Sequence, residues 1–153
     1  MEDTVKSVLA QTYQNWELLF VDDCSTDNSL ELVRAFGDDR IKIFQNEKNC
    51  GAATSRNHAL EMASGRWIAF LDSDDLWIPE KLEKQISYMK ENGVLFSYTD
   101  YEVIDDNNAH VSNFEPQMDV CTYKDILKHN HIGCLTAIYD SERLGKVLIK
   151  KVE

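Results

Sequence analysis

The sequence predicts an α/β protein with a mostly parallel sheet and helices on both of its faces. Short apolar runs of strand length alternate along the chain with longer segments in which apolar residues recur every three or four positions. Two of the runs, 16–21 and 67–71, are almost entirely apolar, as expected of strands buried on both faces. Each of these two runs stops at a group of aspartates.

The composition describes one ordinary globular domain over residues 1–153. Hydrophobic residues make up 43% of the chain and charged residues 28%. The net charge of −11 argues against nucleic acid as a partner and against binding to an anionic membrane surface. The four cysteines form no CxxC pair, which favours reduced thiols and a cytoplasmic location. No apolar run approaches the length of a transmembrane helix.

Helices and strands are predicted from local patterns. Leu82, Ile86 and Met89 form one apolar stripe, and Gly93 suits the end of that helix. The polar segment 105–119 predicts a loop. The predicted order is a helix ending near Thr12, strand 16–21, helix 30–36, strand 41–44, helix 53–65, strand 67–71, helix 79–93, strand 94–98 with an extension at 101–104, helix 122–128 and strand 135–139.

Three carboxylates, Asp72, Asp74 and Asp75, lie within four positions directly after the strand at 67–71. Ligands of open α/β sheets bind beyond the carboxyl ends of the strands. Two such charges 4 Å apart repel by about 4 kcal/mol at an effective dielectric constant near 20. A divalent cation removes that repulsion, and oxygen ligands favour Mg²⁺ or Mn²⁺. The alternative is a solvated acidic turn that caps the next helix.

A second acid pair, Asp22 and Asp23, follows the strand at 16–21. Since the carboxyl ends of parallel strands lie at one edge of a sheet, both acid groups are expected to face one crevice. One group can hold a metal while the other accepts hydrogen bonds from a ribose or a base. Arg56 and Asn57 lie between the two groups in sequence, and Arg56 offers a fork of donors to a phosphate. Its alternative is a surface ion pair, for example with Glu61.

Together these residues resemble the nucleotide-sugar glycosyltransferases of family 2, which have the GT-A fold. The resemblance runs through most of the chain. It rests on matching segments in the expected order: Ser7-Val8-Leu9-Ala10-Gln11-Thr12-Tyr13, Glu17-Leu18-Leu19-Phe20-Val21-Asp22-Asp23, Ser25-Thr26-Asp27, Gly51, Arg56-Asn57, Ala63, Gly65, and Asp72-Ser73-Asp74-Asp75 with Trp77 and Pro79.

The resemblance implies a role for each candidate residue. Asp22 and Asp23 would contact the base or ribose of a nucleoside-diphosphate sugar. Arg56 and Asn57 would lie near the ribose and the diphosphate. Asp72 would approach the ribose or the donor sugar, and the metal site would draw on the acidic group Asp72, Asp74 and Asp75.

The resemblance also implies an activity. The enzyme would transfer a sugar, most simply from a UDP-sugar, to a glycan or lipid-linked acceptor in cell-wall or polysaccharide synthesis, with inversion at the sugar. Residues 1–104 would form the donor-binding core, and residues 105–153 would begin the acceptor side. The full-length protein would work in the cytoplasm, in peripheral contact with the inner face of the membrane.

The chain departs from the family pattern at both ends. The family begins with a strand that ends in a Pro-x-Tyr-Asn-like turn, whereas the first residues here already match the following helix. The aspartate expected as catalytic base falls beyond Glu153, so the catalytic residue is left unassigned. We therefore expect either a piece of a longer enzyme, truncated at both ends, or a degenerate short relative of the family. The loss of an interior strand would leave unpaired strand edges and a cavity in the sheet.

A phosphoacceptor receiver domain of signalling proteins is the main alternative. Receivers also carry an acid pair after one strand, here Asp22 and Asp23, and a phosphorylated aspartate after another, here Asp72. Thr99 and Lys124 fall near the later receiver positions, but Lys124 lies in a helical pattern and lacks a following proline.

Two further readings are weaker. A haloacid-dehalogenase-like phosphatase would use Asp72 and Asp74, but Asp75-Leu76 replaces the residues expected next. His129, His131 and Cys134 suggest zinc but supply three ligands where a structural site needs four.

Overall fold

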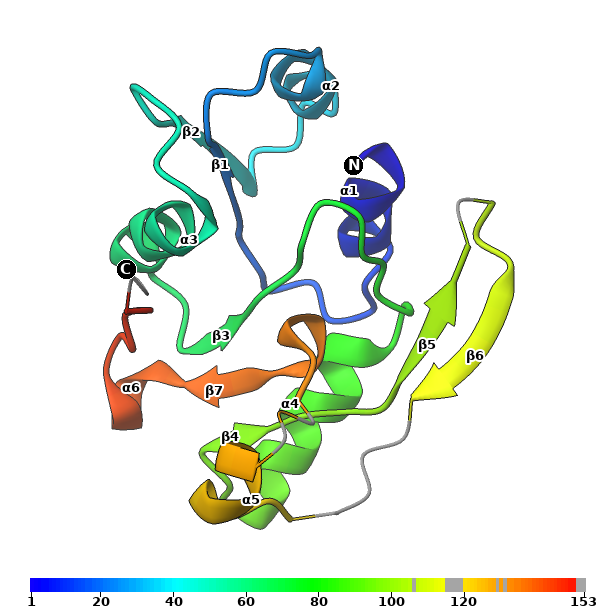
Figure 1. Cartoon of the computed structure of the whole chain (residues 1–153), viewed down its shortest axis with the longest axis vertical. Coiled ribbons are helices and arrows are strands. Elements are labelled where there is room, and N and C mark those ends of the chain that lie inside the picture. The colour runs from blue at the N-terminus through cyan, green and yellow to red at the C-terminus, as the bar shows by residue number, and fades with distance from the viewer. Residues whose placement is uncertain (106, 115–119, 129, 131, 151–153) are drawn as a thin grey trace.

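In this computed structural model of the protein, residues 1–105, 107–114, 120–128, 130 and 132–150 are described (Figure 1). Helices and strands alternate through the first hundred residues, which confirms the α/β class. The elements are α1 (Glu2–Leu9), β1 (Leu18–Asp22), α2 (Ser29–Arg34), β2 (Ile41–Gln45), α3 (Ala52–Met62), β3 (Trp67–Ala69), α4 (Lys81–Asn92), β4 (Phe96–Ser97), β5 (Tyr101–Ile104), β6 (His110–Phe114), α5 (Tyr123–Lys128), the 3₁₀ turn η1 (Cys134–Thr136), β7 (Ile138–Asp140) and α6 (Ser141–Leu144).

The strand pairing is mixed. β1 and β2 pair in parallel, from Leu18 beside Ile41 to Asp22 beside Gln45. β7 lies between β3 and β4 and runs antiparallel to both, and β5 and β6 form an antiparallel hairpin. The prediction of a mostly parallel sheet is therefore correct for β1 and β2, and the strands around β7 depart from it. The chain passes through a hairpin and α5 before it reaches β7, so no single helical crossover sets the direction of that strand.

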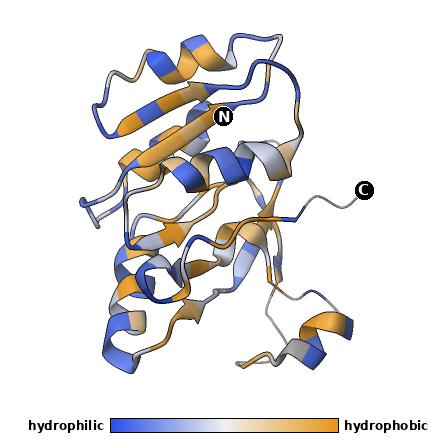
Figure 2. Cartoon of the chain, turned by 90° about the vertical axis from the view of Figure 1, so that its left-hand side faces the viewer, coloured by the Kyte–Doolittle hydropathy of each residue, from blue (hydrophilic) through white to orange (hydrophobic). Residues whose placement is uncertain are grey.

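Helices cover both faces of the strands, as predicted. Successive residues of a strand point to opposite faces. In β7, Ile138 packs into a cluster with Met89 and its neighbours on α4, whereas Tyr139 packs with Leu60 of α3 and Ile68 of β3. Figure 2 shows that the strands are largely hydrophobic, while the helices mix hydrophobic and hydrophilic residues.

Most predicted boundaries lie within a few residues of the observed ones. Two predictions differ more. The segment 105–119, predicted as a loop, contains β6. The side chains of β6 are largely exposed, so its sequence has no apolar run that would predict a strand. Residues 106 and 115–119 lie outside the described residues. The strand predicted at 135–139 begins instead with η1, so only its last residues join the sheet as β7.

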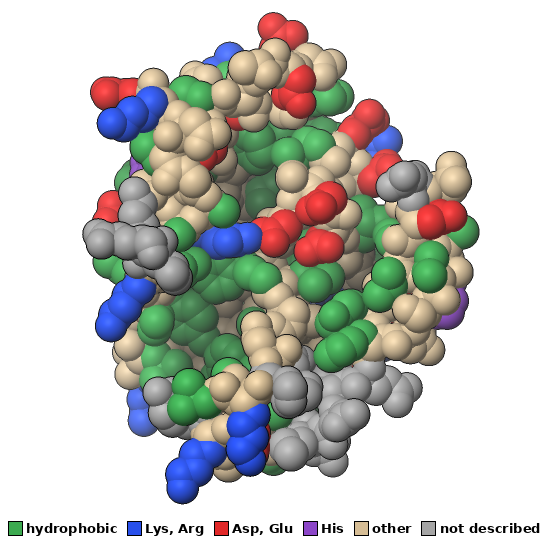
Figure 3. Space-filling model, in the orientation of Figure 1, with side chains coloured by type: hydrophobic (Ala, Val, Ile, Leu, Met, Phe, Trp, Pro, Cys, Tyr) green, Lys and Arg blue, Asp and Glu red, His purple; other side chains and the backbone are tan. Residues whose placement is uncertain are grey.

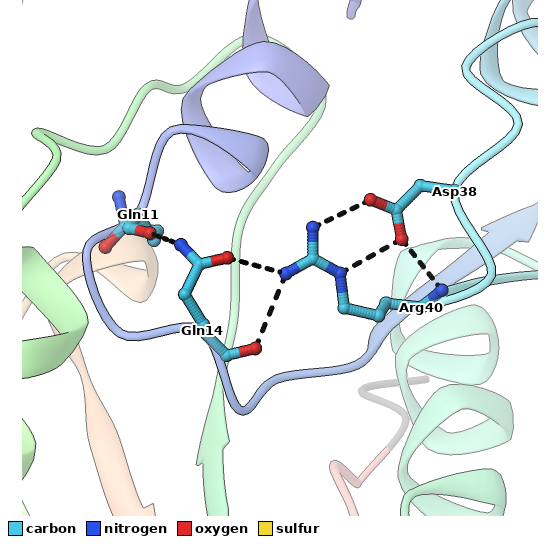
Figure 4. Close-up of polar contacts among 4 residues, drawn as sticks. All are labelled: Gln11, Gln14, Asp38 and Arg40. Carbon is cyan, nitrogen blue, oxygen red and sulfur yellow. Dashed lines mark hydrogen bonds and ion pairs between the residues drawn. The ribbon is translucent and has the colours of Figure 1, made fainter.

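Arg40 fixes the loop that follows α1 to the start of β2 (Figure 4). Its guanidinium donates to the Asp38 carboxylate through Nε (3.0 Å) and Nη2 (2.7 Å) and to Oε1 of Gln14 through Nη1 (3.0 Å). Gln14 in turn donates from Nε2 to the carbonyl of Gln11. The guanidinium also lies 3.8 Å from the centre of the Trp16 ring. The hydrogen bonds from Arg40 lower the pKa of Asp38 to about 2.

Glu17 joins the β1–β2 pair to the turn that leads into β3. Its Oε1 accepts hydrogen bonds from the backbone N–H of Ser64 (2.7 Å) and Gly65 (3.1 Å) and from the Ser64 hydroxyl (2.8 Å). Its Oε2 lies 2.6 Å from Nζ of Lys42 on β2, and the side chain is 18% exposed. Burial by itself raises the pKa of this carboxyl, but the hydrogen bonds from Lys42 and Ser64 outweigh burial and lower the pKa to about 2.

We expect Glu17→Ala to lower the free energy of unfolding at neutral pH by about 1–3 kcal/mol, because donors to a charged acceptor lose their partner. The folded-state pKa of Glu17 lies below its ordinary value of 4.5, so this stabilisation is complete above that value and is lost as the pH falls towards 2. Denaturant unfolding at several pH values should show the difference between the two proteins shrinking in acid. Glu47→Ala, at an exposed glutamate, is the control, and equal losses in both variants would contradict the role assigned to Glu17.

Candidate functional site

A cavity of about 1020 Å³ opens at the carboxyl ends of β1 and β3 and borders Asp22, Asp23, Arg56 and Asp72. The two predicted acid groups therefore meet at one crevice. Figure 3 shows a hollow on this face, lined by hydrophobic side chains, with acidic side chains gathered beside it. Asn57, Asp74 and Asp75, also predicted for the site, are not among the residues that line the cavity.

Asp22 is the last residue of β1 and is 2% exposed. Its carboxylate accepts hydrogen bonds from the backbone N–H of Ser25 (3.2 Å) and from Nε2 of Gln45 at the end of β2 (3.0 Å). Asp22 thus ties together the ends of two neighbouring strands and shapes the turn that follows β1.

Asp23 holds the loop from which α3 begins. Its Oδ1 accepts from Nδ2 of Asn46 (2.8 Å) and from the N–H of Cys50 (2.8 Å), and its Oδ2 accepts from the N–H of Gly51 (2.7 Å). These hydrogen bonds lower the pKa of Asp23, and the bond from Asn46 has the largest effect. Gly51 has φ +82°, a conformation that L side chains rarely adopt, so a glycine suits this tight start of the helix.

Asn46 is a site residue that the sequence analysis missed. Its Nδ2 donates to Oγ of Ser55 (2.9 Å) as well as to Asp23, and its Oδ1 lies 3.1 Å from Nδ1 of His58. Asn46 directly follows β2, just as the acids follow the other strands. Its position at a strand end is therefore the signal that could have identified it.

Arg56 on α3 pairs with Asp72, beyond the end of β3, through a hydrogen bond from Nη2 to Oδ1. The two side chains are 30% and 40% exposed, so the pair lies at the rim of the cavity. The hydrogen bond that Arg56 donates to Asp72 raises the pKa of Arg56, which stays charged. The ion pair of Arg56 is therefore with Asp72 and not with Glu61, the alternative partner. Because the bond to Asp72 uses one nitrogen of a five-donor group, the guanidinium retains donors for an anion.

The residues 72–75 form a compact acidic turn. The N–H of Asp75 donates to the carbonyl of Asp72 (3.1 Å), and the hydroxyl of Thr4 on α1 donates to the carbonyl of Ser73 (2.8 Å). Burial, and then the charges of Asp74 and Asp72, raise the pKa of Asp75. The turn therefore gathers negative charge that its own residues do not neutralise.

These carboxylates fit a cation whose remaining ligands are phosphate oxygens and water. Across the described ranges, no group of three or more His, Cys, Asp or Glu is arranged to hold one metal ion. Mg²⁺, however, is usually bound by one or two carboxylates together with water and substrate phosphates. Asp74 and Asp75 can serve as two such carboxylates. Asp72, predicted as a third ligand, is bonded to Arg56 instead.

Asn57 binds the last described part of the chain. Its Nδ2 donates to the carbonyl of Ile149 (2.9 Å), and its Oδ1 accepts from the N–H of the same residue (2.7 Å). Both ends of this amide are therefore engaged, where the resemblance implied contact with ribose or diphosphate. Asn57 holds the segment after α6 against α3, next to Arg56.

Cys134 of η1 lies near the acidic turn. Burial raises the pKa of its thiol, and the charges of Arg56, Asp72 and Asp75 also act on it. The segment before β7 therefore lies close to the rim of the site. His129 and His131, which were considered with Cys134 as zinc ligands, lie outside the described residues.

Comparison with known proteins identifies the family. The model for glycosyl transferase family 2 matches residues 1–139 of the 153. This chain belongs to glycosyl transferase family 2. The resemblance drawn from the motifs is confirmed, and the receiver and phosphatase alternatives find no support. Lys124, which falls near a later receiver position, lies within α5 and not at a strand end, as its helical pattern predicted.

Two curated relatives are similar over nearly the whole chain. The chain is 43% identical over 154 aligned residues to the putative teichuronic acid biosynthesis glycosyltransferase TuaG of Bacillus subtilis, covering 99% of this chain and 61% of TuaG. It is 53% identical over 142 residues to the UDP-Glc:alpha-D-GlcNAc-diphosphoundecaprenol beta-1,3-glucosyltransferase WfgD of Escherichia coli, covering 93% of this chain and 55% of WfgD. The chain therefore spans a little over half the length of these relatives.

Solved glycosyltransferase structures confirm the GT-A fold. S. aureus TarS 1–349 in complex with UDP superposes with a TM-score of 0.69 at 26% identity, covering 93% of this chain and 43% of TarS. The mannosyltransferase PcManGT from Pyrobaculum calidifontis, solved with GDP-Man and Mn²⁺, gives a TM-score of 0.66 at 20% identity, covering 95% and 42%. The second likeness is one of fold alone.

We expect Asp23→Ala to speed amide hydrogen exchange at Cys50 and Gly51 by roughly tenfold, because both N–H groups lose their acceptor. Asp27→Ala is a matched control, since Asp27 accepts from the N–H of Ser29 (3.0 Å) and should change exchange only there. Residue-resolved NMR exchange measures both. Unchanged exchange at Cys50 and Gly51 in Asp23→Ala would show that Asp23 does not hold this loop.

Proposed function

We propose that this protein binds a UDP-sugar and transfers the sugar to a lipid-linked or glycan acceptor with the help of a divalent cation. The observation that carries the proposal is the meeting of Asp22, Asp23, Arg56 and Asp72 around one cavity, beside an acidic turn, in a member of family 2. UDP is chosen because WfgD is named for transfer from UDP-Glc and because TarS was solved with UDP. UDP-glucose is accordingly the first donor to test.

In this proposal Asp22 and Asp23 lie next to the nucleoside end of the donor. A carboxylate offers about four lone-pair sites. Asn46, Cys50 and Gly51 donate to three of them, and the side chain of Ser55 also acts on Asp23, so a ribose hydroxyl or a base N–H would share Asp23 with these donors. Asp22, which is buried, acts by shaping the turn that Asp23 follows.

Arg56 and Asp72 are assigned to the middle of the donor. Arg56 directs its remaining N–H groups at the diphosphate, and its bond to Asp72 holds the guanidinium in place. Asp72 approaches the ribose or the donor sugar. Asn57, occupied by Ile149, would reach the donor only if that contact opened.

Asp74 and Asp75 would hold the cation together with phosphate oxygens. A cation bound there would stabilise the negative charge that builds up on the leaving diphosphate as the sugar–phosphate bond breaks. An inverting course requires a base that takes the proton of the attacking acceptor hydroxyl. No residue within the described ranges is assigned that role.

The division into a donor core at 1–104 and an acceptor side beginning at 105–153 is part of the proposal. The second range also contributes to the first, because β7 pairs with β3 and β4 and Cys134 lies near the acidic turn. In the described parts of the chain, no helix is both long and apolar enough to span a bilayer. WfgD is named for an acceptor on diphosphoundecaprenol, so we place the reaction in the cytoplasm, in peripheral contact with the inner face of the membrane.

We expect this protein to bind UDP in the presence of Mn²⁺, measured by isothermal titration calorimetry. Asp74→Ala and Asp75→Ala should each weaken the Mn²⁺-dependent part of the affinity by roughly tenfold or more, which corresponds to about 1.4 kcal/mol. Each substitution removes one carboxylate from a cation site that has few protein ligands.

Asp39→Ala is the control, since it removes one negative charge in the turn before β2, away from the cavity. CDP and GDP serve as comparison ligands for the choice of base. UDP affinity that is independent of Mn²⁺ and unchanged in both acidic-turn variants would refute the cation assignment, and absence of binding to every nucleotide would refute donor binding by this chain.

A further inference from the structure

A row of polar residues on α1 and just past its end is turned towards the protein. Thr4, Ser7 and Gln11 are spaced by three and four positions, which places them on one side of a helix. Thr4 is 7% exposed, Gln11 is 0% exposed and Ser7 is half-buried. Buried polar groups need hydrogen-bond partners. All three residues find partners in one segment, 73–82, which contains most of the acidic turn.

The residues 70–80, between β3 and α4, form neither a helix nor a strand. Figure 1 shows this segment as a green loop that passes beside α1. Within the acidic turn, the N–H of Asp75 donates to the carbonyl of Asp72 (3.1 Å). The carboxylates of the turn repel one another, so its compact shape needs support from outside the turn.

Thr4 holds the peptide unit directly before Asp74. Its hydroxyl donates to the carbonyl of Ser73 (2.8 Å). The carbonyl of Ser73 and the N–H of Asp74 belong to one planar peptide unit. A hydrogen bond that holds this carbonyl therefore also restricts the backbone from which the Asp74 side chain projects.

Ser7 holds a peptide unit on the other side of the acids. Its Oγ accepts a hydrogen bond from the N–H of Trp77 (3.2 Å), and this N–H shares a peptide unit with the carbonyl of Leu76, the residue after Asp75. The hydroxyl of Ser7 donates its own proton to the carbonyl of Thr4 (2.7 Å), which leaves its lone pairs for Trp77. The backbone is thus held by α1 on both sides of the two acids.

The end of α1 is docked separately on the start of α4. Gln11 donates from Nε2 to the carbonyl of Ile78 (2.7 Å) and accepts at Oε1 from the N–H of Leu82 (3.0 Å). The N–H of Thr12 donates to the carbonyl of Pro79 (2.9 Å). These bonds fix α1 as a support, whereas the two hydroxyls nearer its start reach the acidic turn itself.

We propose that Thr4 and Ser7 are positioning residues for the cation site, which hold Asp74 and Asp75 in place before the cation binds. The proposal rests on the proposed function, in which these two carboxylates hold the cation. A site with few protein ligands gains affinity when those ligands are already ordered, because binding then removes less conformational freedom. Both residues would act through the backbone of the turn.

The first test uses the protein free of metal and nucleotide. Thr4→Val removes the hydroxyl and keeps a branched side chain of similar size. Amide hydrogen exchange at Asp75, followed by residue-resolved NMR, should become roughly tenfold faster, because the turn loses its support and opens more often. Thr4→Ser keeps the hydroxyl and should restore the exchange rate of the unsubstituted protein.

Thr12→Val is the matched control. The hydroxyl of Thr12 donates to Oε2 of Glu83 on α4 (2.6 Å). The same substitution therefore also removes a hydrogen bond between this part of the chain and the segment after β3, but away from the acidic turn. It should leave both the exchange at Asp75 and the affinity for UDP unchanged.

The second test is isothermal titration calorimetry of UDP with and without Mn²⁺. Thr4→Val and Ser7→Ala should each weaken the Mn²⁺-dependent part of the affinity by roughly tenfold, as is typical when a group that orients a metal ligand is removed. The affinity for UDP without Mn²⁺ should stay the same. A general loss of structure would not act on the Mn²⁺-dependent part alone, and thermal unfolding shows whether each variant is folded.

The positioning role would be refuted by unchanged exchange at Asp75 in Thr4→Val, by unchanged Mn²⁺-dependent affinity in both Thr4→Val and Ser7→Ala, or by equal effects of Thr12→Val. Failure of Thr4→Ser to restore the exchange rate would refute it as well. If the unsubstituted protein binds UDP without any dependence on Mn²⁺, the cation assignment of the proposed function fails and this proposal fails with it. Measuring the unsubstituted protein first separates that case from a failure of the positioning role alone.

Discussion

The arrangement of this molecule depends on the hydrogen bonds and the ion pair of the Glu17 carboxylate. Within the described residues, the β1–β2 pair and the β3–β7–β4 sheet share no strand pairing, so other contacts set their separation. Glu17 bridges them at one end of the cavity by binding Lys42 on one side and the turn at Ser64 and Gly65 on the other. The acids at the opposite end of the same strands can face each other because this end is fixed.

Two acids of the candidate site, Asp23 and Asp75, differ in the direction of their pKa shifts. Asp23 has a lowered pKa because N–H groups of the protein already donate to it, so its charge is used to hold the loop before α3. Asp75 has a raised pKa because it is partly buried and lies near Asp74 and Asp72. A carboxylate of the first kind stabilises the fold, while one of the second kind gains from a cation supplied with the substrate. In the proposed function, this difference would let a protein of net charge −11 offer a place to a diphosphate.

Local patterns were sufficient to predict most elements of the first hundred residues, because an apolar run or stripe depends only on near neighbours in sequence. They also predicted acids at two strand ends. They did not predict which partner each polar group takes, since Asp72 binds Arg56 and Asn57 binds Ile149 across long stretches of chain. For the same reason β7 was predicted as a strand but not as the antiparallel neighbour of both β3 and β4. On α4, an apolar stripe was predicted correctly, but the buried face also contains Lys81 and Gln85. Lys81 donates to the side chain of Gln85, which in turn donates to the carbonyl of Thr136, far away in the sequence.

The position of β7 has a consequence for how the protein is made. Trp67 of β3 pairs with Asp140 of β7, and β4 pairs with β7 and not with β3. β3 and β4 therefore have no shared ladder until β7 arrives, and closing so long a stretch of chain is slow. On a ribosome, this sheet stays open until the residues of β7 have left the exit tunnel, whereas β1 and β2 can pair much earlier. The nascent chain thus exposes the unpaired edges of β3 and β4 until β7 has been made, a period in which a chaperone would be most useful.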